Sequence, residues 1–272
     1  MDLGLKDRTG IVVGGSRGIG KAIALALADE GMNLVIAARN PQRLDDTVKE
    51  IAASSGTTIT GIACDVRDRE QVDAMIENAV AQLGSLNVLI NSGSAPGGSS
   101  TATGYIETIV DEDLLEDFNI KYLGALRCSR ASIPHLQRAG WGRIINISGL
   151  NARIAGNLSG GARNGSLVHL TKTLANQLGR DGITVNCIHP GITRTERTPA
   201  LLEARGQRSG QSAVDVENSD YAKGSPRSNA IGRMVDASEI AHLATFLCSD
   251  KAWSVTGEVI AADGGGSNAV YY

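Results

Sequence analysis

Glycines at positions 14, 18 and 20 lie in the stretch "VVGGSRGIGKAIALAL", between an apolar run and an amphipathic run. A tight turn needs residues without Cβ, and the backbone must come close to a pyrophosphate bound there. The N-terminus of the following helix would offer free N–H groups and the positive end of its dipole to that anion. The context therefore predicts dinucleotide binding, and a plain glycine-rich turn is the weaker alternative.

The second apolar run ends in "AARN", and this ending bears on the choice of cofactor. An enzyme that prefers NAD usually has an acidic residue there, which binds the ribose 2′-OH. Ala37 and Ala38 cannot make that contact, whereas Arg39 follows them and Arg17 lies in the glycine turn on the same side. Two guanidinium groups suit a 2′-phosphate. We therefore expect NADP(H), with merely solvated arginines as the alternative.

Further cofactor contacts are expected where later strands end. Asp65 and Val66 in "CDV" follow the third apolar run, and the Asp65 carboxylate could bond the adenine. Asn91 and Gly93 end the fourth run, beside the expected path of the cofactor. In the glycine turn itself the expected contacts are Gly14, Ser16, Arg17, Gly18, Ile19 and Gly20.

Positioning these residues requires a parallel sheet. Seven short β-branched runs are continuous rather than alternating, which is typical of strands buried on both faces; they span 10–14, 33–38, 58–63, 86–91, 142–148, 183–188 and 257–262. Amphipathic stretches lie between them, with Gly31 and Gly84 as helix stops and Asp236 or Ser238 as a cap. The pattern predicts an α/β Rossmann fold, doubly wound with helices on both faces, as one domain over 1–272.

Composition excludes several classes of function. The 272 residues carry a formal net charge of −3 with a pI near 5.8, so no broad basic field favours nucleic acid or an anionic membrane. The four cysteines are widely spaced and form no metal-ligand cluster. The polar start of the chain, without an apolar signal region, makes a cytoplasmic location the expectation.

Two polar segments interrupt the alternation of runs. The first, at 92–105, is rich in Gly and Ser, and the second, at 192–230, is long and charged. A loop of that length usually has a use, which favours a flexible substrate lid over a disordered insertion. Its arginines at 194, 197, 205 and 208 fit an anionic substrate or a solvated lid face, and the sequence leaves both open.

Several motifs together resemble the short-chain dehydrogenase/reductase family over nearly the whole chain. They are "GGSRGIG" at 14–20, "CDV" at 64–66, "NVLINSG" at 87–93, "GRIINIS" at 142–148 and "GITVNCIHPG" at 182–191. The resemblance implies a seven-stranded doubly wound sheet, a nicotinamide cofactor and a homotetramer or homodimer. It also implies that Pro190, Gly191 and Ile192 hold the nicotinamide end, and that Thr193 or Thr195 contacts the cofactor phosphates.

The family's catalytic residues are replaced in this chain. In the family a Tyr transfers the proton, a Lys lowers its pKa, a Ser polarises the carbonyl and an Asn positions a water. Alignment without a gap places the Ser on Gly149, the Tyr on Gly160 and the Lys on Asn164. One inserted residue would instead bring Ser159 and Arg163 to the last two positions. Lys121 stands at the Asn position.

Lys121 is the first candidate for the missing proton donor. By the resemblance, its ammonium group would enter the space that the family's Lys fills, beside Asn164, and burial would lower its pKa. The alternative is a solvent-facing lysine on an amphipathic helix. Ser148 and Ser159 could hydrogen-bond a substrate oxygen, while Tyr105 and Tyr221 are weaker candidates for the acid.

The first functional hypothesis is therefore an NADP(H)-dependent oxidoreductase with an atypical proton relay, acting on a small carbonyl or alcohol. The alternatives are a catalytically silent NADP(H)-binding protein or sensor, and a lyase or isomerase on the same fold.

Overall fold

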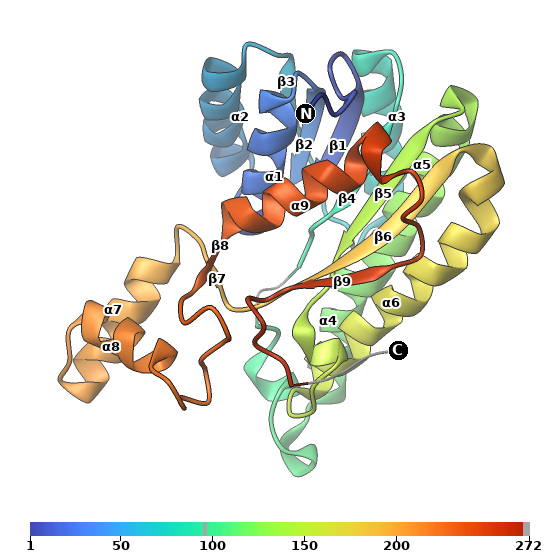
Figure 1. The fold of residues 1–272 in the computed structure, drawn as a ribbon. Helices are drawn as coiled ribbons and strands as arrows, with labels where there is room; N and C mark the ends of the chain where they lie inside the picture. Colours follow the sequence, from blue (N-terminus) through green and yellow to red (C-terminus); the bar gives the residue numbers. More distant parts are fainter. Residues whose placement is uncertain (95–96, 269–272) are drawn as a thin grey trace.

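A seven-stranded parallel sheet forms the centre of the protein in a computed structural model that describes residues 1–94 and 97–268 (Figure 1). The strand order is β3-β2-β1-β4-β5-β6-β9. The strands are β1 (Thr9–Val13), β2 (Asn33–Ala38), β3 (Ile59–Ala63), β4 (Val88–Asn91), β5 (Gly142–Ile147), β6 (Ile183–Pro190) and β9 (Val259–Ala262). Every adjacent pair is parallel, so the predicted fold class is confirmed.

Helices cover both faces of the sheet. On one face lie α1 (Gly18–Asp29), α2 (Pro41–Ser55) and α9 (Ala237–Cys248), and on the other α3 (Arg69–Leu83), α5 (Gly124–Ala139) and α6 (Leu158–Leu178). Successive residues of β1 alternate between the two cores, with Val12 packed in the first and Ile11 and Val13 in the second. Continuous apolar strands are what two covered faces require.

The predicted helix ends hold, and four strands, β3, β4, β5 and β9, are one or two residues shorter than predicted. Gly84 caps α3 in the left-handed region, and Asp236 precedes α9, where Glu239 accepts a hydrogen bond from its backbone N–H at 2.8 Å. The fourth strand begins at Val88 instead of Leu86. The Asn87 side chain accepts from the backbone N–H of Thr9, and the Asn87 backbone donates to the Thr9 carbonyl oxygen and accepts from Arg143.

The first polar segment leads from the sheet into helix. Of its residues 92–105, Ala95 and Pro96 lie outside the described residues. The 3₁₀ turns η1 (Ser100–Ala102) and η2 (Ile106–Thr108) precede α4 (Asp111–Phe118). One turn of π-helix, η3 (Asn119–Leu123), then connects α4 to α5. Such π-turns occur frequently at functional sites. The other short turns are η4 (Leu150–Ala152), η5 (Gly179–Asp181) and η6 (Asp250–Ala252).

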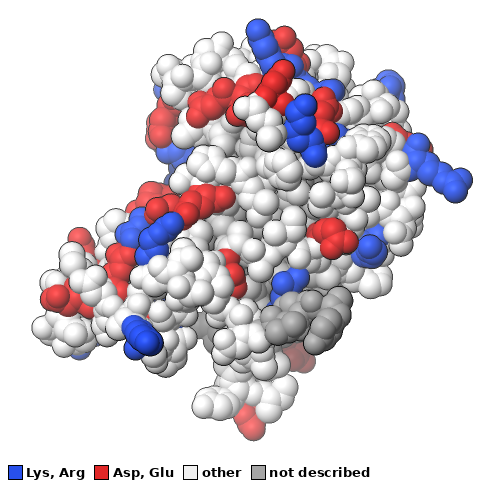
Figure 2. All heavy atoms as spheres, in the orientation of Figure 1, with Lys and Arg blue, Asp and Glu red and all other residues white. Residues whose placement is uncertain are grey.

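The second polar segment contains two helices instead of the predicted long loop. After β7 (Thr193–Arg194) come α7 (Thr198–Ser209) and α8 (Ala213–Tyr221), which pack on each other and project from one side of the molecule (Figure 1). We call residues 198–221 the hairpin. Basic and acidic side chains intermix over it (Figure 2). Ion pairs such as Arg205–Asp220 stabilise these helices in place of the apolar pattern that would have predicted them.

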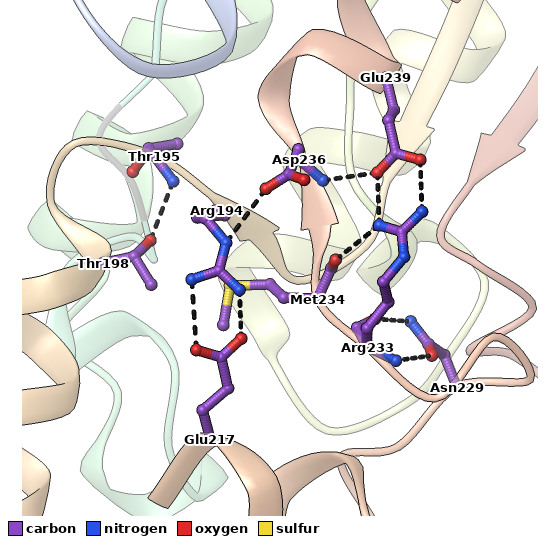
Figure 3. A network of polar contacts seen from close by, with 9 residues as sticks. All are labelled: Arg194, Thr195, Thr198, Glu217, Asn229, Arg233, Met234, Asp236 and Glu239. Carbon is purple, nitrogen blue, oxygen red and sulfur yellow. Dashed lines mark hydrogen bonds and ion pairs between the residues drawn. The ribbon is translucent and has the colours of Figure 1, made fainter. Parts of the chain in front are cut away.

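A polar network fixes the base of the hairpin to the body (Figure 3). The Arg194 side chain donates to Glu217 of α8 and to Asp236 at the start of α9, the latter at 3.1 Å. Arg194 also belongs to β7, which pairs with β8 (Val235–Asp236). Within the residues that the structure describes, no helix is both long and apolar enough to cross a membrane.

Candidate functional site

A cavity of about 1230 Å³ opens at the carboxyl ends of β1, β2, β4, β5 and β6. This is the edge at which doubly wound sheets bind their ligands, and the volume exceeds that of an ordinary small-molecule pocket. The cavity is lined by most residues expected at the cofactor: Gly14, Ser16, Arg17, Gly18, Ile19, Gly20, Arg39, Asp65, Val66, Gly93, Pro190, Gly191, Ile192 and Thr195. The sheet therefore brings together residues that are distant in sequence.

The glycine turn is closely packed in the way that the sequence predicts. Gly14 has a φ of 77°, and a Cβ there would lie 2.7 Å from the backbone of Ser92. A Cβ on Gly20 would lie 2.3 Å from the carbonyl oxygen of Gly14. A side chain at Gly14 would therefore push the turn away from the chain that follows β4, and one at Gly20 would push the start of α1 away from the turn.

A carboxylate already lies at the N-terminus of α1. Glu196, which follows β7, accepts a hydrogen bond from the backbone N–H of Gly18 at 3.0 Å. Helix N-termini favour anions because their first N–H groups have no partner within the helix. Glu196 therefore occupies a place that suits a phosphate oxygen, and it connects this place to the segment that leads into the hairpin.

Positive charge gathers at the adjoining end of the cavity. Arg17, Arg39, Arg43 and Arg197 all line it. The pKa of Arg17 is lowered by partial burial and then by the like charges of Arg197, Arg43 and Arg39, while Glu196 opposes the shift. Like charges held this close together favour a polyanionic ligand, as expected for a 2′-phosphate.

Two expected cofactor contacts are engaged elsewhere. Asn91 does not line the main cavity; its side-chain amide donates to Asn146 at 2.9 Å and to Ser129 at 3.2 Å. Its amide therefore connects β4 to β5 and α5, and its contact with the cofactor stays a prediction. The Asp65 carboxylate accepts hydrogen bonds from Arg67, and these hydrogen bonds lower its pKa.

Lys121 points inward from the π-helix and lines the cavity, with 7% of its surface exposed. Its Nζ donates a hydrogen bond to the carbonyl oxygen of Ser148 at 3.0 Å. Burial, and then the positive charge of Arg163, lower its pKa from 10.5 to about 7. The alternative of a solvent-facing lysine is therefore wrong. A lysine with this pKa can hold or release a proton near neutral pH.

Ser148 and Asn164 lie together beside Lys121 in the cavity wall. The Ser148 hydroxyl donates to the backbone carbonyl of Asn164 at 3.0 Å. The side-chain oxygen Oδ1 of Asn164 is buried without a hydrogen-bond partner. A buried acceptor of this kind needs a donor, and a ribose hydroxyl in the cavity would supply one.

The positions that correspond to the family's Ser and Tyr are filled by other groups. A Cβ on Gly149 would lie 2.7 Å from Nδ2 of Asn164. A Cβ on Gly160 would lie 2.5 Å from Asn151 and 2.9 Å from Asn157, whose side chain caps α6 by accepting from the Gly160 N–H. The cavity wall is thus repacked around the two glycines.

Ser159 does not line the cavity, contrary to its expected contact with substrate. Its hydroxyl donates to Asp117 at 2.6 Å, which accounts for its burial. Tyr105 is 83% exposed on the surface and does not line the cavity. Tyr221 is buried in the hairpin and does not line the cavity, so it is not placed to act as the acid there.

The alignment without a gap gave Arg163 no place in the site. It lines the cavity on the turn of α6 before Asn164, and it lies 3.9 Å from Asp117 of α4. Only the alignment with one inserted residue drew attention to it, and no sequence signal indicated Asp117. In the described part of the chain no cluster of metal-ligating side chains occurs. The four cysteines are buried and unbridged.

Comparisons with known proteins agree with this fold. A family model described as enoyl-(acyl carrier protein) reductase matches residues 13–267. The short-chain reductase protein NovJ of Streptomyces niveus is 34% identical over 96% of this chain and 94% of its own length. The NADPH-dependent reductase BacG of Bacillus subtilis is 32% identical over 98% of this chain and all of its own.

A solved structure shares the whole architecture. The L-sorbose reductase of Gluconobacter frateurii, complexed with NADPH and L-sorbose, superposes with a TM-score of 0.91 at 27% identity, covering 99% of this chain and 100% of its own. The chain therefore belongs to the short-chain dehydrogenase/reductase family.

Proposed function

We propose that this protein is an NADPH-dependent reductase of a small carbonyl compound, in which Lys121 supplies the proton. One observation carries the proposal: a buried lysine lines the cavity beside Ser148, together with Asn164 at the position of the family's Lys, and its pKa is lowered to about 7. The NADPH that BacG is named for and that the sorbose reductase contains supports the same cofactor here.

The residues present fit such a cofactor. The glycine turn and the N–H of Gly18 suit the pyrophosphate, since Glu196 already binds there through a carboxylate. Arg17 and Arg39 suit the 2′-phosphate, and the unsatisfied oxygen of Asn164 suits a ribose hydroxyl. NADPH supplies the hydride when it is bound.

The chain's own residues handle the proton. Lys121 holds it on Nζ, and the carbonyl oxygen of Ser148 orients that group by accepting a hydrogen bond. The Asn164 carbonyl in turn fixes the Ser148 side chain. As negative charge develops on the substrate oxygen, protonated Lys121 stabilises it and then transfers the proton.

The test follows NADPH absorbance over a panel of aldehydes and ketones. Wild type should oxidise NADPH with at least one of them, and Lys121→Met should reduce kcat by about 100-fold or more, in the range typical of a lost acid. Lys49→Met, at an exposed position on α2, is the matched control and should keep full activity. Full activity of Lys121→Met would refute the mechanism.

The same experiment distinguishes the alternatives. Tight NADPH binding without turnover of any carbonyl would favour the silent binding protein or sensor, and conversion of a substrate without NADPH oxidation would favour a lyase or isomerase. A homotetramer or homodimer and a cytoplasmic location stay predictions.

A further inference from the structure

The amino group of Lys121 is buried and yet borders a large cavity. The residue is 7% exposed and lines the space of about 1230 Å³ at the carboxyl ends of the strands. One turn of π-helix, η3, places it there. A small molecule that enters the cavity can therefore reach Nζ, although Nζ is largely removed from bulk water.

The polar partner of this amino group is a backbone carbonyl. Nζ donates to the carbonyl oxygen of Ser148 at 3.0 Å, and no carboxylate of the described residues forms an ion pair with it. A carboxylate would favour the charged ammonium, whose nitrogen has no lone pair. A carbonyl oxygen accepts a hydrogen bond from a neutral amine as well, and the lone pair of that amine stays free to react.

Burial is the first cause of the lowered pKa of Lys121, which falls from 10.5 to about 7. Charged and titratable side chains from several elements act on Lys121 directly or through one another. They are Asp117, Arg153, Arg163, Cys187, His189 and Asp263. Because desolvation comes first, the neutral amine does not depend on an exact balance among these charges.

The neutral form of a lysine is a nucleophile. At pH 7 about half of the Lys121 side chains are neutral, whereas an ordinary lysine is neutral in roughly one molecule of 3,000. Lysines that are desolvated in this way are the ones that form Schiff bases with carbonyl compounds. The cavity therefore contains a nucleophile as well as a proton donor.

We propose that Lys121 captures small aldehydes in the cavity as a reversible imine. The protein would then have a covalent carbonyl-binding activity that needs no NADPH. Aldehydes are the favoured class, because their carbonyl carbon carries a single substituent and is open to attack. This inference goes beyond the proposed reduction, since the new bond joins the carbonyl compound to the protein itself.

The reaction balances without any further reagent. The lone pair of neutral Nζ attacks the carbonyl carbon, and the C=O electron pair moves to the oxygen. The nitrogen gives its two protons to that oxygen, which leaves as water while the C=N bond forms. Once water has protonated the imine, its nitrogen carries a single N–H, and the Ser148 carbonyl oxygen can accept it. The hydrogen bond that positions the amine thus also suits the adduct.

The other lysines of the chain provide an internal comparison. None of these six lysines is buried, and none lines the cavity. Lys21 forms an ion pair with Glu50 at 2.6 Å. The other five are exposed: Lys6, Lys49, Lys172, Lys223 and Lys251. We therefore expect aldehyde capture to be selective for Lys121.

The test is reductive trapping with butanal and sodium cyanoborohydride at pH 7 without NADPH, with the rate at each lysine followed by peptide mass spectrometry. In the folded protein Lys121 should be alkylated about 10-fold or more faster than any exposed lysine, because its neutral fraction is far larger. In guanidinium chloride, which exposes Lys121, this difference should disappear. A rate at Lys121 no higher than at the exposed lysines of the folded protein would overturn the inference.

The pH dependence gives a second readout. The neutral fraction of Lys121 approaches its maximum soon above pH 7, whereas that of an exposed lysine grows about 10-fold per pH unit up to pH 9. The ratio of the Lys121 rate to the rate at exposed lysines should therefore fall steeply between pH 7 and pH 9. A constant ratio would mean that Lys121 reacts as an ordinary lysine and would refute the capture.

Two variants locate the reaction. Lys121→Met should remove the fast phase of labelling from the intact protein, while Lys49→Met, at an exposed position on α2, should keep it. The same measurements separate this inference from the proposed function. Fast trapping at Lys121 in a protein that oxidises NADPH with no carbonyl would refute the reductase and support the capture. Carbonyl reduction together with slow trapping at Lys121 would refute the capture alone.

Discussion

Replacing Lys121 by Met should change the stability of the protein in a way that depends on pH. The pKa of Lys121 falls from 10.5 in the unfolded chain to about 7 in the fold, chiefly because of burial. Between these values the unfolded chain binds one proton more than the folded protein. The stability of wild type therefore rises with pH relative to Lys121→Met, by about 1.4 kcal/mol per pH unit.

The magnitude follows from the same two pKa values. Below pH 7 the folded protein must hold a buried ammonium group, at a cost on the order of 5 kcal/mol. The Met variant avoids this cost but loses the hydrogen bond to Ser148, worth about 1.5–3 kcal/mol for a charged donor. Lys121→Met should thus be more stable than wild type by a few kcal/mol at pH 6. This advantage should disappear by pH 10.

Urea unfolding followed by circular dichroism at pH 6, 7, 8, 9 and 10 measures this difference, with all proteins at one concentration. Lys49→Met, an exposed lysine on α2, should follow wild type at every pH. Parallel stability curves for wild type and Lys121→Met would show that Lys121 is not a buried, deprotonating group, and the proposed proton donor would be lost with it.

Three further predictions concern the nucleotide end of the cavity. Glu196→Gln should lower the Kd for NADPH by several-fold in fluorescence titration, because the carboxylate occupies the Gly18 N–H and repels phosphate; unchanged or weaker binding would contradict this. Arg39→Ala should weaken NADPH binding by about 10-fold or more while leaving the Kd of NADH nearly unchanged, and an equal loss for both would exclude its contact with the 2′-phosphate. Gly20→Ala should abolish NADPH binding and lower the Tm, since its Cβ would lie 2.3 Å from the Gly14 carbonyl oxygen; wild-type values would refute the packing argument.

The sequence predicted the sheet well because its strands carry a strong signal. Runs such as 33–38 are apolar at every position after Asn33, and both of their faces are indeed covered. The helices of the hairpin gave no such signal, because α7 and α8 pack mainly on each other and depend on ion pairs such as Arg205–Asp220. Charged pairs between helices leave no periodic apolar pattern in the sequence.

The parts of the site that depend on backbone conformation could be predicted from the sequence. The parts that depend on where side chains point could be predicted less well. The glycine turn follows from the space that each Cβ would fill, which is local information. The inward direction of Lys121 depends on one turn of π-helix, and no residue type in "NIKYL" specifies that turn. Asp117 lies beside Arg163 because α4 packs against α6. A single sequence does not show which helices pack against each other, so this contact could not be predicted.

The repacking around Gly149 and Gly160 bears on how this active site can evolve. A serine at 149 would displace the amide of Asn164, and a tyrosine at 160 would displace the cap formed by Asn157. Restoring the family's residues one at a time would therefore disturb the present wall before any of the former chemistry returned. Proteins with this arrangement would therefore not readily regain the family's proton donor by single substitutions. Relatives that share Lys121 should also keep Gly149, Gly160, Asn157 and Asn164 together.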